Sequence, residues 1–283
     1  MRCASYSLLS IRYSLLVVVH VHGAAVRPRQ HVAAARRNRK LEMIPEFDRY
    51  PIFYFTNHRS IQGPGEIKCM PDHFEKLDFE LEAAIVICRQ GRNIKAEDAD
   101  QYIGGLMIMN DMSARRLQME EMLLNLGPAK GKDFATVIGP MLVTLEELHA
   151  FEIPAKQNHT GKNWNLEMKC SVNGVTVSKG NLSDMDWSFA EIIERASYGV
   201  DLYPGDIIGS GTVGTGCFLE LNGTGKLYDP GYKEQWLQNG DTVEMEMDGL
   251  GILTNMIVAE QTDWSILNYS SIPSACSHIP ASC

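Results

Sequence analysis

The amino-acid sequence predicts an α+β protein with a large, mostly antiparallel β-core and a few flanking helices. Segments with the pattern of β-strands dominate, and helices do not separate them regularly, which argues against a series of parallel β-α-β units. Apolar residues make up 45% of the 283 residues and charged residues 22%. This is the composition of an ordinary globular protein that can bury a sizeable core.

In the first half of the chain, residues 29–43 have the pattern of a basic helix and residues 50–58 that of an aromatic-rich strand. The glycines and proline of residues 61–67 predict a turn. A strand, a helix, a second strand and a second helix are then expected at residues 77–87, 96–103, 104–111 and 113–126, with Asp111 or Ser113 as the N-cap of the last helix.

The second half of the chain begins with an expected strand at residues 141–148. Residues 166–180 predict a β-hairpin, because Asn-Gly at its centre favours a type I′ turn. An amphipathic helix is expected at residues 188–197, with Ser188 as its N-cap. The remaining elements are a strand, a turn and a strand at residues 202–222, and a final pair of strands at residues 240–258.

The strand LDFELEAAIVI, at residues 77–87, carries a row of acids toward the interior. Asp78, Glu80 and Glu82 alternate with apolar residues and therefore share one face of the strand. Asp111 follows later, at an expected strand-to-helix corner. Three carboxylates from two elements can bind one face of an octahedral hard cation such as Mg²⁺. The alternative is a solvated, acidic edge strand.

Polar and basic residues follow this corner. Arg115 and Gln118 are one helical turn apart, and Lys132 and Thr136 lie in a glycine-containing loop. Beside a cation held by carboxylates, these side chains would form a site for an oxyanion or an enolate. The alternatives are a salt bridge from Arg115 to Glu120 or Glu121, and an exposed Lys132.

The segment GSGTVG, at residues 209–214, matches the dinucleotide-binding pattern G-x-G-x-x-G. That fold requires a helix directly afterwards, whereas CFLELN, at residues 217–222, has the pattern of a strand. We therefore interpret the glycines, Gly211 among them, as allowing the backbone to approach a small ligand closely. The Thr212 hydroxyl would face the same ligand. A plain tight turn is the alternative.

The charge distribution is uneven. The net charge is −9, but residues 1–41 contain eight Arg and Lys and no acid, which leaves 18 basic against 35 acidic residues in the remainder. An acidic body argues against nucleic acid as a partner and suits the binding of cations. Seven cysteines without a C-x-x-C pair indicate a reducing compartment. No apolar run approaches the length of about 18 residues that a membrane span needs.

The two ends of the chain differ in composition from its centre. Residues 1–28 contain Ser and Arg but no acid, which is typical of a mitochondrial transit peptide. The alternatives are a secretory signal peptide and a wrongly assigned start. Residues 267–283 are rich in Ser and Pro and are expected to be disordered. We expect a catalytic domain at residues 29–266, in the cytoplasm, or in a mitochondrion if residues 1–28 are a genuine leader.

Six segments resemble, in their order, the fumarylacetoacetate hydrolase (fumarylacetoacetase) superfamily: FTNHRSIQGPGEI, DFELEAAIVI, GGLMIMNDMSARRLQ, GKDFATVIGP, LYPGDIIGSGTVGTG and NGDTVEMEMDGLGILTNMIV. The resemblance covers roughly residues 29–266 and implies a mixed β-sandwich roll, usually a homodimer. It also implies a divalent metal, commonly Mg²⁺, with Mn²⁺ and Ca²⁺ as alternatives. The residues expected at this metal site are Glu80, Glu82 and Asp111, with Lys132 and Thr136 beside them.

The resemblance also assigns roles around the substrate. In members that hydrolyse fumarylacetoacetate, the residues that match Arg115, Gln118 and Lys132 surround the developing oxyanion. Thr212 matches a residue that contacts the substrate carboxylate, and Tyr54 aligns loosely with an aromatic contact. The expected substrate-binding residues are therefore Tyr54, Gly211 and Thr212.

A water-activating His–Glu pair is implied in the same way. RQH at residues 29–31 is similar to the family's His segment, and FLEL at residues 218–221 is similar to a late strand that carries the Glu. His31 and Glu220 are thus the expected pair, in which the carboxylate orients the imidazole and the imidazole takes a proton from water. The family places an Asp seven residues before this His, where the present chain has Ala24.

Together these features predict a metal-dependent hydrolase that cleaves a C–C bond in a 1,3-diketo acid of the fumarylacetoacetate or acylpyruvate class, as in aromatic amino acid catabolism. One alternative is the decarboxylation or isomerisation of a 2-keto or 2-hydroxydienoic acid on the same metal site, which should depend less on His31. The other is a decayed, non-catalytic metal-binding dimer.

Overall fold

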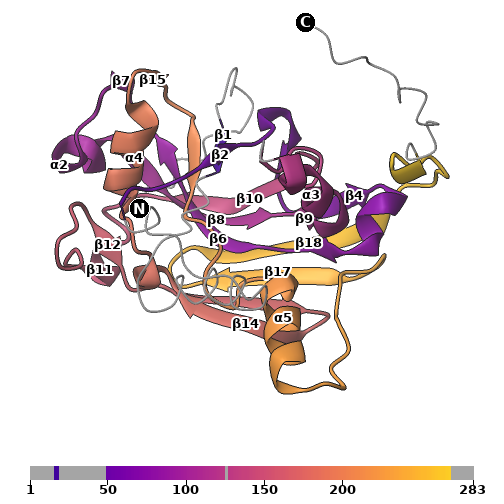
Figure 1. Ribbon diagram of the computed structural model, residues 1–283. Coiled ribbons are helices and arrows are strands. Elements are labelled where there is room, and N and C mark those ends of the chain that lie inside the picture. Colours follow the sequence, from indigo (N-terminus) through magenta and orange to yellow (C-terminus); the bar gives the residue numbers. More distant parts are fainter. Residues whose placement is uncertain (1–15, 19–48, 125–126, 269–283) are drawn as a thin grey trace, which may run out of the picture.

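The computed structural model describes residues 16–18, 49–124 and 127–268. Two large mixed β-sheets lie face to face in it (Figure 1). The seven strands of the first sheet are, in spatial order, β2 (Tyr54–Phe55), β1 (Leu16–Val18), β16 (Ile207–Gly209), β6 (Leu81–Ile87), β8 (Ile103–Asp111), β10 (Thr136–Val143) and β3 (Ile61–Gln62).

The second sheet has five strands, and three two-stranded sheets complete the β-structure of the described residues. In spatial order the five are β14 (Val175–Asn181), β13 (Glu167–Val172), β17 (Thr242–Met247), β18 (Gly251–Ala259) and β4 (Gly65–Cys69). The small sheets pair β11 (Glu152–Ile153) with β12 (Asn163–Trp164), β7 (Gly91–Arg92) with β15 (Asp201–Leu202), and β5 (Leu77–Asp78) with β9 (Ser113–Ala114).

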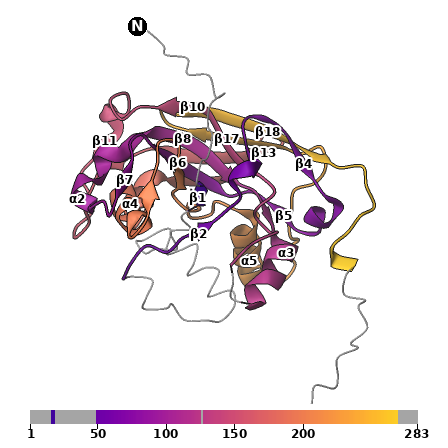
Figure 2. The ribbon, with the colours of Figure 1, turned by 90° about the horizontal axis from the view of Figure 1, so that it is seen from above.

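Antiparallel pairs predominate, and the parallel ones are β1–β16, β3–β10 and β4–β18. Within residues 49–124 and 127–268, the α-helices are α2 (Ala96–Ala99), α3 (Arg115–Glu121), α4 (Phe189–Ser197) and α5 (Phe218–Tyr228). Figures 1 and 2 show α2 and α4 at one end of the sheets, and α3 and α5 toward the other. The predicted α+β fold, a mixed roll with a mostly antiparallel core and a few flanking helices, is confirmed.

The main hydrophobic core lies between the two large sheets. Inward-facing residues of β6 and β8, such as Leu81 and Ile108, meet residues of β13 and β17, such as Met168 and Met245. A smaller apolar cluster covers the opposite face of the seven-stranded sheet and includes Ala84, Met107 and Met109. Because strand residues alternate between faces, the side chains that share a face with this smaller cluster point away from the main core.

Several expected elements are confirmed at or near their predicted positions. Residues 77–87 form β5 and β6, and residues 166–180 form the hairpin β13–β14, with Asn173 and Gly174 at positive φ in its turn. The hydroxyl of Ser188 accepts the backbone N–H of Glu191 at the start of α4, in a capping box. Residues 240–258 contain β17 and β18.

The interpretation of residues 217–222 as a strand is wrong, because α5 begins at Phe218. The carboxylate of Asp78 accepts the first N–H groups of this helix: Phe218 N and Leu219 N lie 2.7 and 3.0 Å from the two oxygens. Because Asp78 is distant in sequence, the residues around position 218 contain no signal for this cap. The dinucleotide-binding fold is nevertheless absent among the described residues, because β16 pairs antiparallel with β6 and no β-α-β unit surrounds the glycines.

Other boundaries also differ from the prediction, and residues 61–67, expected as a turn, include β3 and the start of β4. The helix expected at residues 113–126 begins at Arg115, because Ser113 and Ala114 pair with β5, and its N-cap Ala114 makes no side-chain cap. The strand expected at residues 141–148 is β10, which starts at Thr136 because it pairs along β8.

The helical pattern at residues 29–43, most of the proposed leader and nearly all of the expected disordered tail fall outside the described residues. Within residues 1–28, Leu16–Val18 form β1, between β2 and β16. In the part of the chain that the structure describes, no helix is long and apolar enough to span a membrane.

Candidate metal and substrate site

Three buried carboxylates converge on the face of the seven-stranded sheet that points away from the main core. Glu82 lies on β6, Glu80 directly precedes this strand, and Asp111 ends β8. One ligand atom of each lies within 4.8 Å of the others, and none of the three residues is more than 1% exposed. Antiparallel pairing of β6 with β8 fixes this arrangement, and Asp111 N donates to Glu80 O at 3.3 Å.

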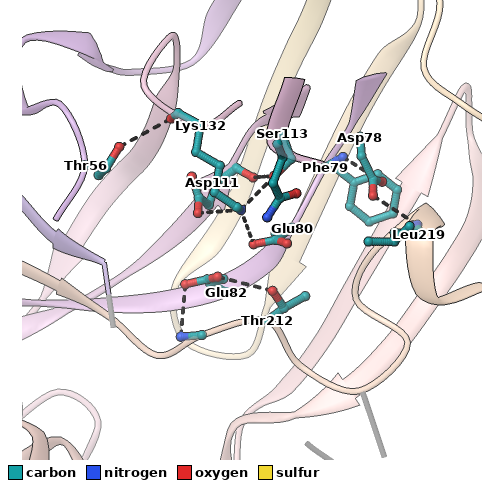
Figure 3. Close-up of polar contacts among 12 residues, drawn as sticks. Thr56, Asp78, Phe79, Glu80, Glu82, Asp111, Ser113, Lys132, Thr212 and Leu219 are labelled. Carbon is teal, nitrogen blue, oxygen red and sulfur yellow. Dashed lines mark hydrogen bonds and ion pairs between the residues drawn. The ribbon is translucent and has the colours of Figure 1, made fainter. Parts of the chain in front are cut away.

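The side chain of Lys132 is buried against these carboxylates (Figure 3). Its Nζ donates to Glu80 Oε2 at 2.6 Å, to Asp111 Oδ2 at 2.8 Å and to Ser113 Oγ at 2.7 Å. All three ammonium hydrogens thus have an acceptor, so the expectation that Lys132 belongs to the site, rather than to the surface, agrees with its position.

Arg115 is equally buried and bridges two acids. Its Nη2 forms ion pairs of 2.8 Å with Asp78 Oδ2 and with Glu80 Oε1, and its Nη1 donates to Gln118 Oε1 at 3.0 Å. The alternative of a salt bridge to a glutamate of its own helix is wrong. Glu120 pairs with Arg116, and Glu121 accepts backbone N–H groups of the loop at residues 130–131.

The glycine-rich loop after β16 lies directly against Glu82. Gly211 N donates to Glu82 Oε2 at 3.0 Å, and Thr212 Oγ1 to Glu82 Oε1 at 3.4 Å (Figure 3). A Cβ atom at Gly209, the last residue of β16, would lie 2.8 Å from Glu82 Oε2, so a side chain there would displace the Glu82 carboxylate. Tyr54 completes the surroundings, because its hydroxyl donates to Asp111 Oδ2.

The cluster carries more negative than positive charge. Asp78, Glu80, Glu82 and Asp111 face two cations, Arg115 and Lys132, and all six residues are buried. Burial, followed by the repulsion of Asp111 and Glu80, raises the pKa of Glu82 well above its ordinary value. Burial acts to lower the pKa of Lys132, but the carboxylates of Asp111 and Glu80 outweigh it and raise that pKa. With all four carboxylates ionised, the two cations would leave a formal charge of −2 on the cluster.

The residues present fit a divalent cation. Asp111 Oδ1 and Thr136 Oγ1 are buried and have no hydrogen-bond partner among the described residues. They come from directly paired positions of β8 and β10, so they lie side by side on the sheet. Unpaired oxygens, three convergent carboxylates and a charge deficit of two match the oxygen ligands and the charge that Mg²⁺ or Mn²⁺ prefers.

The expected water-activating pair is not assembled among the described residues. Glu220 lies in the first turn of α5 rather than on a strand, is 4% exposed, and accepts the backbone N–H of Thr215 at 2.8 Å. His31 lies outside the described residues, and none of the histidines within them forms a hydrogen bond or ion pair with the carboxylate cluster. The pairing of His31 with Glu220 stays a prediction.

Sequence reasoning missed the roles of Asp78 and Ser113. Asp78 was visible on the acidic face of its strand, but its partners, Arg115 and the start of α5, are distant in sequence. Ser113 was expected to cap a helix, whereas its hydroxyl donates to Asp111 O and accepts from Lys132.

The protein is thus a mixed β-roll with a buried carboxylate cluster that could hold a divalent cation. A buried Lys and a buried Arg lie next to this cluster, as in a candidate enzyme site. The chain belongs to the fumarylacetoacetate hydrolase family: the model of the fumarylacetoacetate (FAA) hydrolase C-terminal domain matches residues 20–258. The resemblance that the sequence motifs indicated is thereby confirmed.

The relatives include isomerases as well as hydrolases. Oxaloacetate tautomerase YisK of Bacillus subtilis (strain 168) is 31% identical over 254 residues, which cover 88% of this chain and 76% of the relative. The mitochondrial oxaloacetate tautomerase Fahd2a of Rattus norvegicus is 33% identical over 214 residues, or 74% of this chain and 59% of the relative. The chain therefore spans less than two thirds of the rat protein.

Solved structures give the same picture. A fumarylacetoacetate hydrolase from Exiguobacterium antarcticum aligns with a TM-score of 0.64 and 26% identity, over 87% of this chain and 76% of the other. A 2-hydroxyhepta-2,4-diene-1,7-dioate isomerase from Mycobacterium marinum aligns with a TM-score of 0.57 and 27% identity, over 75% and 70%.

Proposed function

We propose that the protein is a divalent-metal-dependent isomerase that interconverts the enol and keto forms of a small 2-keto dicarboxylic acid of the oxaloacetate class. The observation that carries the proposal is the placement of two buried cations, Arg115 and Lys132, on the carboxylate cluster. Such an arrangement suits an enolate, in which negative charge spreads over a carbon and an oxygen and no nucleophilic water is needed.

The chain's own residues would divide the work of binding. A divalent cation bound by Glu80, Glu82 and Asp111 would act as a Lewis acid toward the keto oxygen of the substrate. Lys132 and Arg115 would stabilise charge that develops on the enolate. These cations are fixed before the substrate arrives, because their nitrogen atoms already have carboxylate partners at 2.6–2.8 Å.

The substrate carboxylate would lie at the glycine-rich loop, where Gly211 N and the Thr212 hydroxyl, which donate to Glu82 in this structure, would donate to the substrate when Glu82 turns to the cation. Tyr54 borders the same space, because its hydroxyl contacts Asp111. Hydrogen-bond donors of this kind fix the orientation of a small acid.

Hydrolysis of a 1,3-diketo acid is the second candidate, and the similarity to a solved fumarylacetoacetate hydrolase favours it. It would require His31 to reach the cluster and Glu220 to orient the imidazole. The carboxylate of Glu220 already serves the backbone of Thr215 in the turn before α5. The two tautomerases among the relatives also support isomerisation over hydrolysis.

The mitochondrial location of the rat relative supports the mitochondrial alternative for this chain. We retain the homodimer as part of the proposal.

The experiment follows the ultraviolet absorbance of the enol form of oxaloacetate after dilution into buffer, with Mg²⁺ and again with a chelator. A parallel assay uses acylpyruvates and fumarylacetoacetate. Glu80→Gln should reduce enol conversion by at least about 100-fold, the size of effect that follows the loss of one electrostatic group. Glu97→Gln on α2 is the matched control, because Glu97 is exposed.

The variant His31→Ala separates the candidates. Metal-dependent enol conversion that survives His31→Ala would support the isomerase. Metal-dependent cleavage of an acylpyruvate that His31→Ala abolishes would instead establish the hydrolase. A protein that binds Mg²⁺ but accelerates neither reaction would contradict both and favour the non-catalytic dimer.

A further inference from the structure

We propose that Asp78 is a positioning residue for the metal site. It restrains the guanidinium of Arg115 and balances its charge, so that this group orients Glu80. The inference rests on the metal site of the proposed function, but on no particular substrate or reaction.

The carboxylate of Asp78 is completely buried and accepts hydrogen bonds from three backbone N–H groups and one guanidinium. Oδ1 accepts Phe79 N at 3.0 Å and Phe218 N at 2.7 Å, and Oδ2 accepts Leu219 N at 3.0 Å and Arg115 Nε at 2.8 Å. This carboxylate therefore caps α5, as its contact with Leu219 in Figure 3 shows, and binds Arg115 at the same time.

Arg115 transmits the position of Asp78 to the metal ligand Glu80. Its Nη2 lies 2.8 Å from Asp78 Oδ2 and 2.8 Å from Glu80 Oε1, so one planar guanidinium joins the two acids. Because the guanidinium is rigid and planar, its contacts with Asp78 also fix the position of the nitrogen that contacts Glu80. Without the negative charge of Asp78, the full positive charge of the guanidinium would act on Glu80 and would repel a cation bound there.

The same link fastens the glycine-rich loop at both ends. Glu82 binds Gly211 and Thr212 near the start of the loop, while Asp78 binds the first residues of α5 at its end. Between them, Leu81 N donates to Gly216 O at 2.9 Å. The alternating acids of the strand thus have separate tasks: Glu80 and Glu82 face the cation, and Asp78 holds the elements around it.

The test is titration of the purified full-length protein with Mn²⁺ by isothermal calorimetry, with the melting temperature as a measure of folding. Asp78→Asn keeps an acceptor for α5 but loses the charge. It should raise the Kd for Mn²⁺ about 10-fold to 100-fold, the usual cost of losing a group that orients a metal ligand. Asp201→Asn is the matched control, because Asp201 pairs with Arg92 at the surface and should leave this Kd unchanged.

A second change shows whether Asp78 acts through Arg115. Adding Arg115→Gln to Asp78→Asn removes the unrestrained charge and should bring the Kd back toward the wild-type value, whereas a merely structural role predicts a further loss. An unchanged Kd in a folded Asp78→Asn variant, a double variant that binds no better than the single one, or a wild-type protein that binds no Mn²⁺ would overturn the inference.

A variant of Arg115 alone keeps the test decisive if Asp78→Asn does not fold. Arg115→Lys retains the positive charge, but it loses the Nε contact with Asp78 and the Nη1 contact with Gln118 that fix the orientation of the guanidinium. It should raise the Kd for Mn²⁺ at least about threefold. An unchanged Kd in this variant would show that the bridge does not position Glu80 and would overturn the inference.

Discussion

Each buried charge of this site depends on its ion-pair partners. Lys132 is the clearest case, because its ammonium group is fully buried and pairs with Glu80 and Asp111. Removing one partner of a buried ion pair leaves the other charge in a medium of low polarity, which costs more than the pair itself contributes.

Lys132→Met should therefore lower the free energy of unfolding of the metal-free protein by about 3–5 kcal/mol. Urea unfolding in the presence of a chelator measures this. Lys130→Met, in the same loop, is the control: Lys130 pairs with Asp133 at 2.8 Å, but its side chain is 61% exposed, so its loss should cost less than about 1 kcal/mol. Equal losses in the two variants would contradict the buried network.

His73 makes stability depend on pH. It lies in the 3₁₀-helix at Pro71–Glu75, accepts Met70 N at its Nδ1 and stacks on Phe134. Burial lowers its pKa from 6.5 to about 4, so the folded state favours the neutral ring. Its contribution is fully present above pH 6.5 and is lost as the pH falls toward 4, because the unfolded state binds the proton first.

Between pH 6.5 and 4 the wild-type protein should therefore lose up to about 3 kcal/mol more stability than His73→Gln. Urea unfolding at a series of pH values gives the two slopes, and comparing slopes removes the pH-independent loss of the aromatic contact. His149→Gln is the control, because the His149 side chain is 85% exposed. Identical slopes in the wild type and His73→Gln would refute this assignment.

At the residue scale, the sequence predicts those site residues whose position depends on the alternation of side chains along a strand. Glu80 and Glu82 share a face because a strand has a period of two, and Asp111 joins them because β8 pairs with β6. Asp78 follows the same alternation, but it does not join the three carboxylates, because its partners lie on α3 and α5. Such partners depend on tertiary contacts that no local pattern contains.

At the scale of elements, the approach of the glycine-rich loop to β6 determines the shape of the site. Gly209 pairs with Ala84, and a Cβ atom there would lie 2.4 Å from Met109 Cε and 2.8 Å from Glu82 Oε2. Gly209→Ala should therefore displace Glu82, cost about 1–3 kcal/mol of stability and weaken Mn²⁺ binding. Urea unfolding and Mn²⁺ titration measure the two effects.

Gly63→Ala is the appropriate control, because a Cβ atom at Gly63 would meet nothing within 4 Å. It should leave both stability and Mn²⁺ binding close to the wild-type values. A Gly209→Ala variant that bound Mn²⁺ normally would show that the loop can move without disturbing Glu82.

Element prediction succeeded where a local signal sets the boundary and failed where a distant residue sets it. Ser188 caps α4 from within its own sequence, and the Asn-Gly turn ends β13 locally. In contrast, α5 contains two glycines and an apolar alternation that resembles a strand, and it begins where the carboxylate of Asp78 caps it from another element.

At the scale of the whole molecule, the two sheets separate the hydrophobic core from the charged site. The core fills the space between them, while the carboxylates lie on the opposite face of the seven-stranded sheet, next to Lys132 and Arg115. The strands thus position the carboxylates, while the loop before β10 supplies Lys132 and α3 supplies Arg115. This arrangement concentrates a deficit of two positive charges in a protein that is already acidic overall.

A divalent cation should therefore stabilise the whole protein. At a Mg²⁺ concentration 100 times the Kd, mass action stabilises the folded state by about 2.7 kcal/mol. For a domain of this size that raises the melting temperature by roughly 5–10 °C, as differential scanning calorimetry can measure. NaCl at the same ionic strength is the control, because general screening of the net charge would act with either salt.

The variant Glu82→Gln should change the melting temperature differently with and without a divalent cation. Burial raises the pKa of Glu82, so in the metal-free protein a neutral side chain at this position is favoured. With a chelator the variant should melt at or above the wild-type temperature, whereas with Mg²⁺ it should show little of the increase. Glu167→Gln, at an exposed position of β13, should behave like the wild type in both conditions. A full Mg²⁺ response in Glu82→Gln would exclude Glu82 as a ligand.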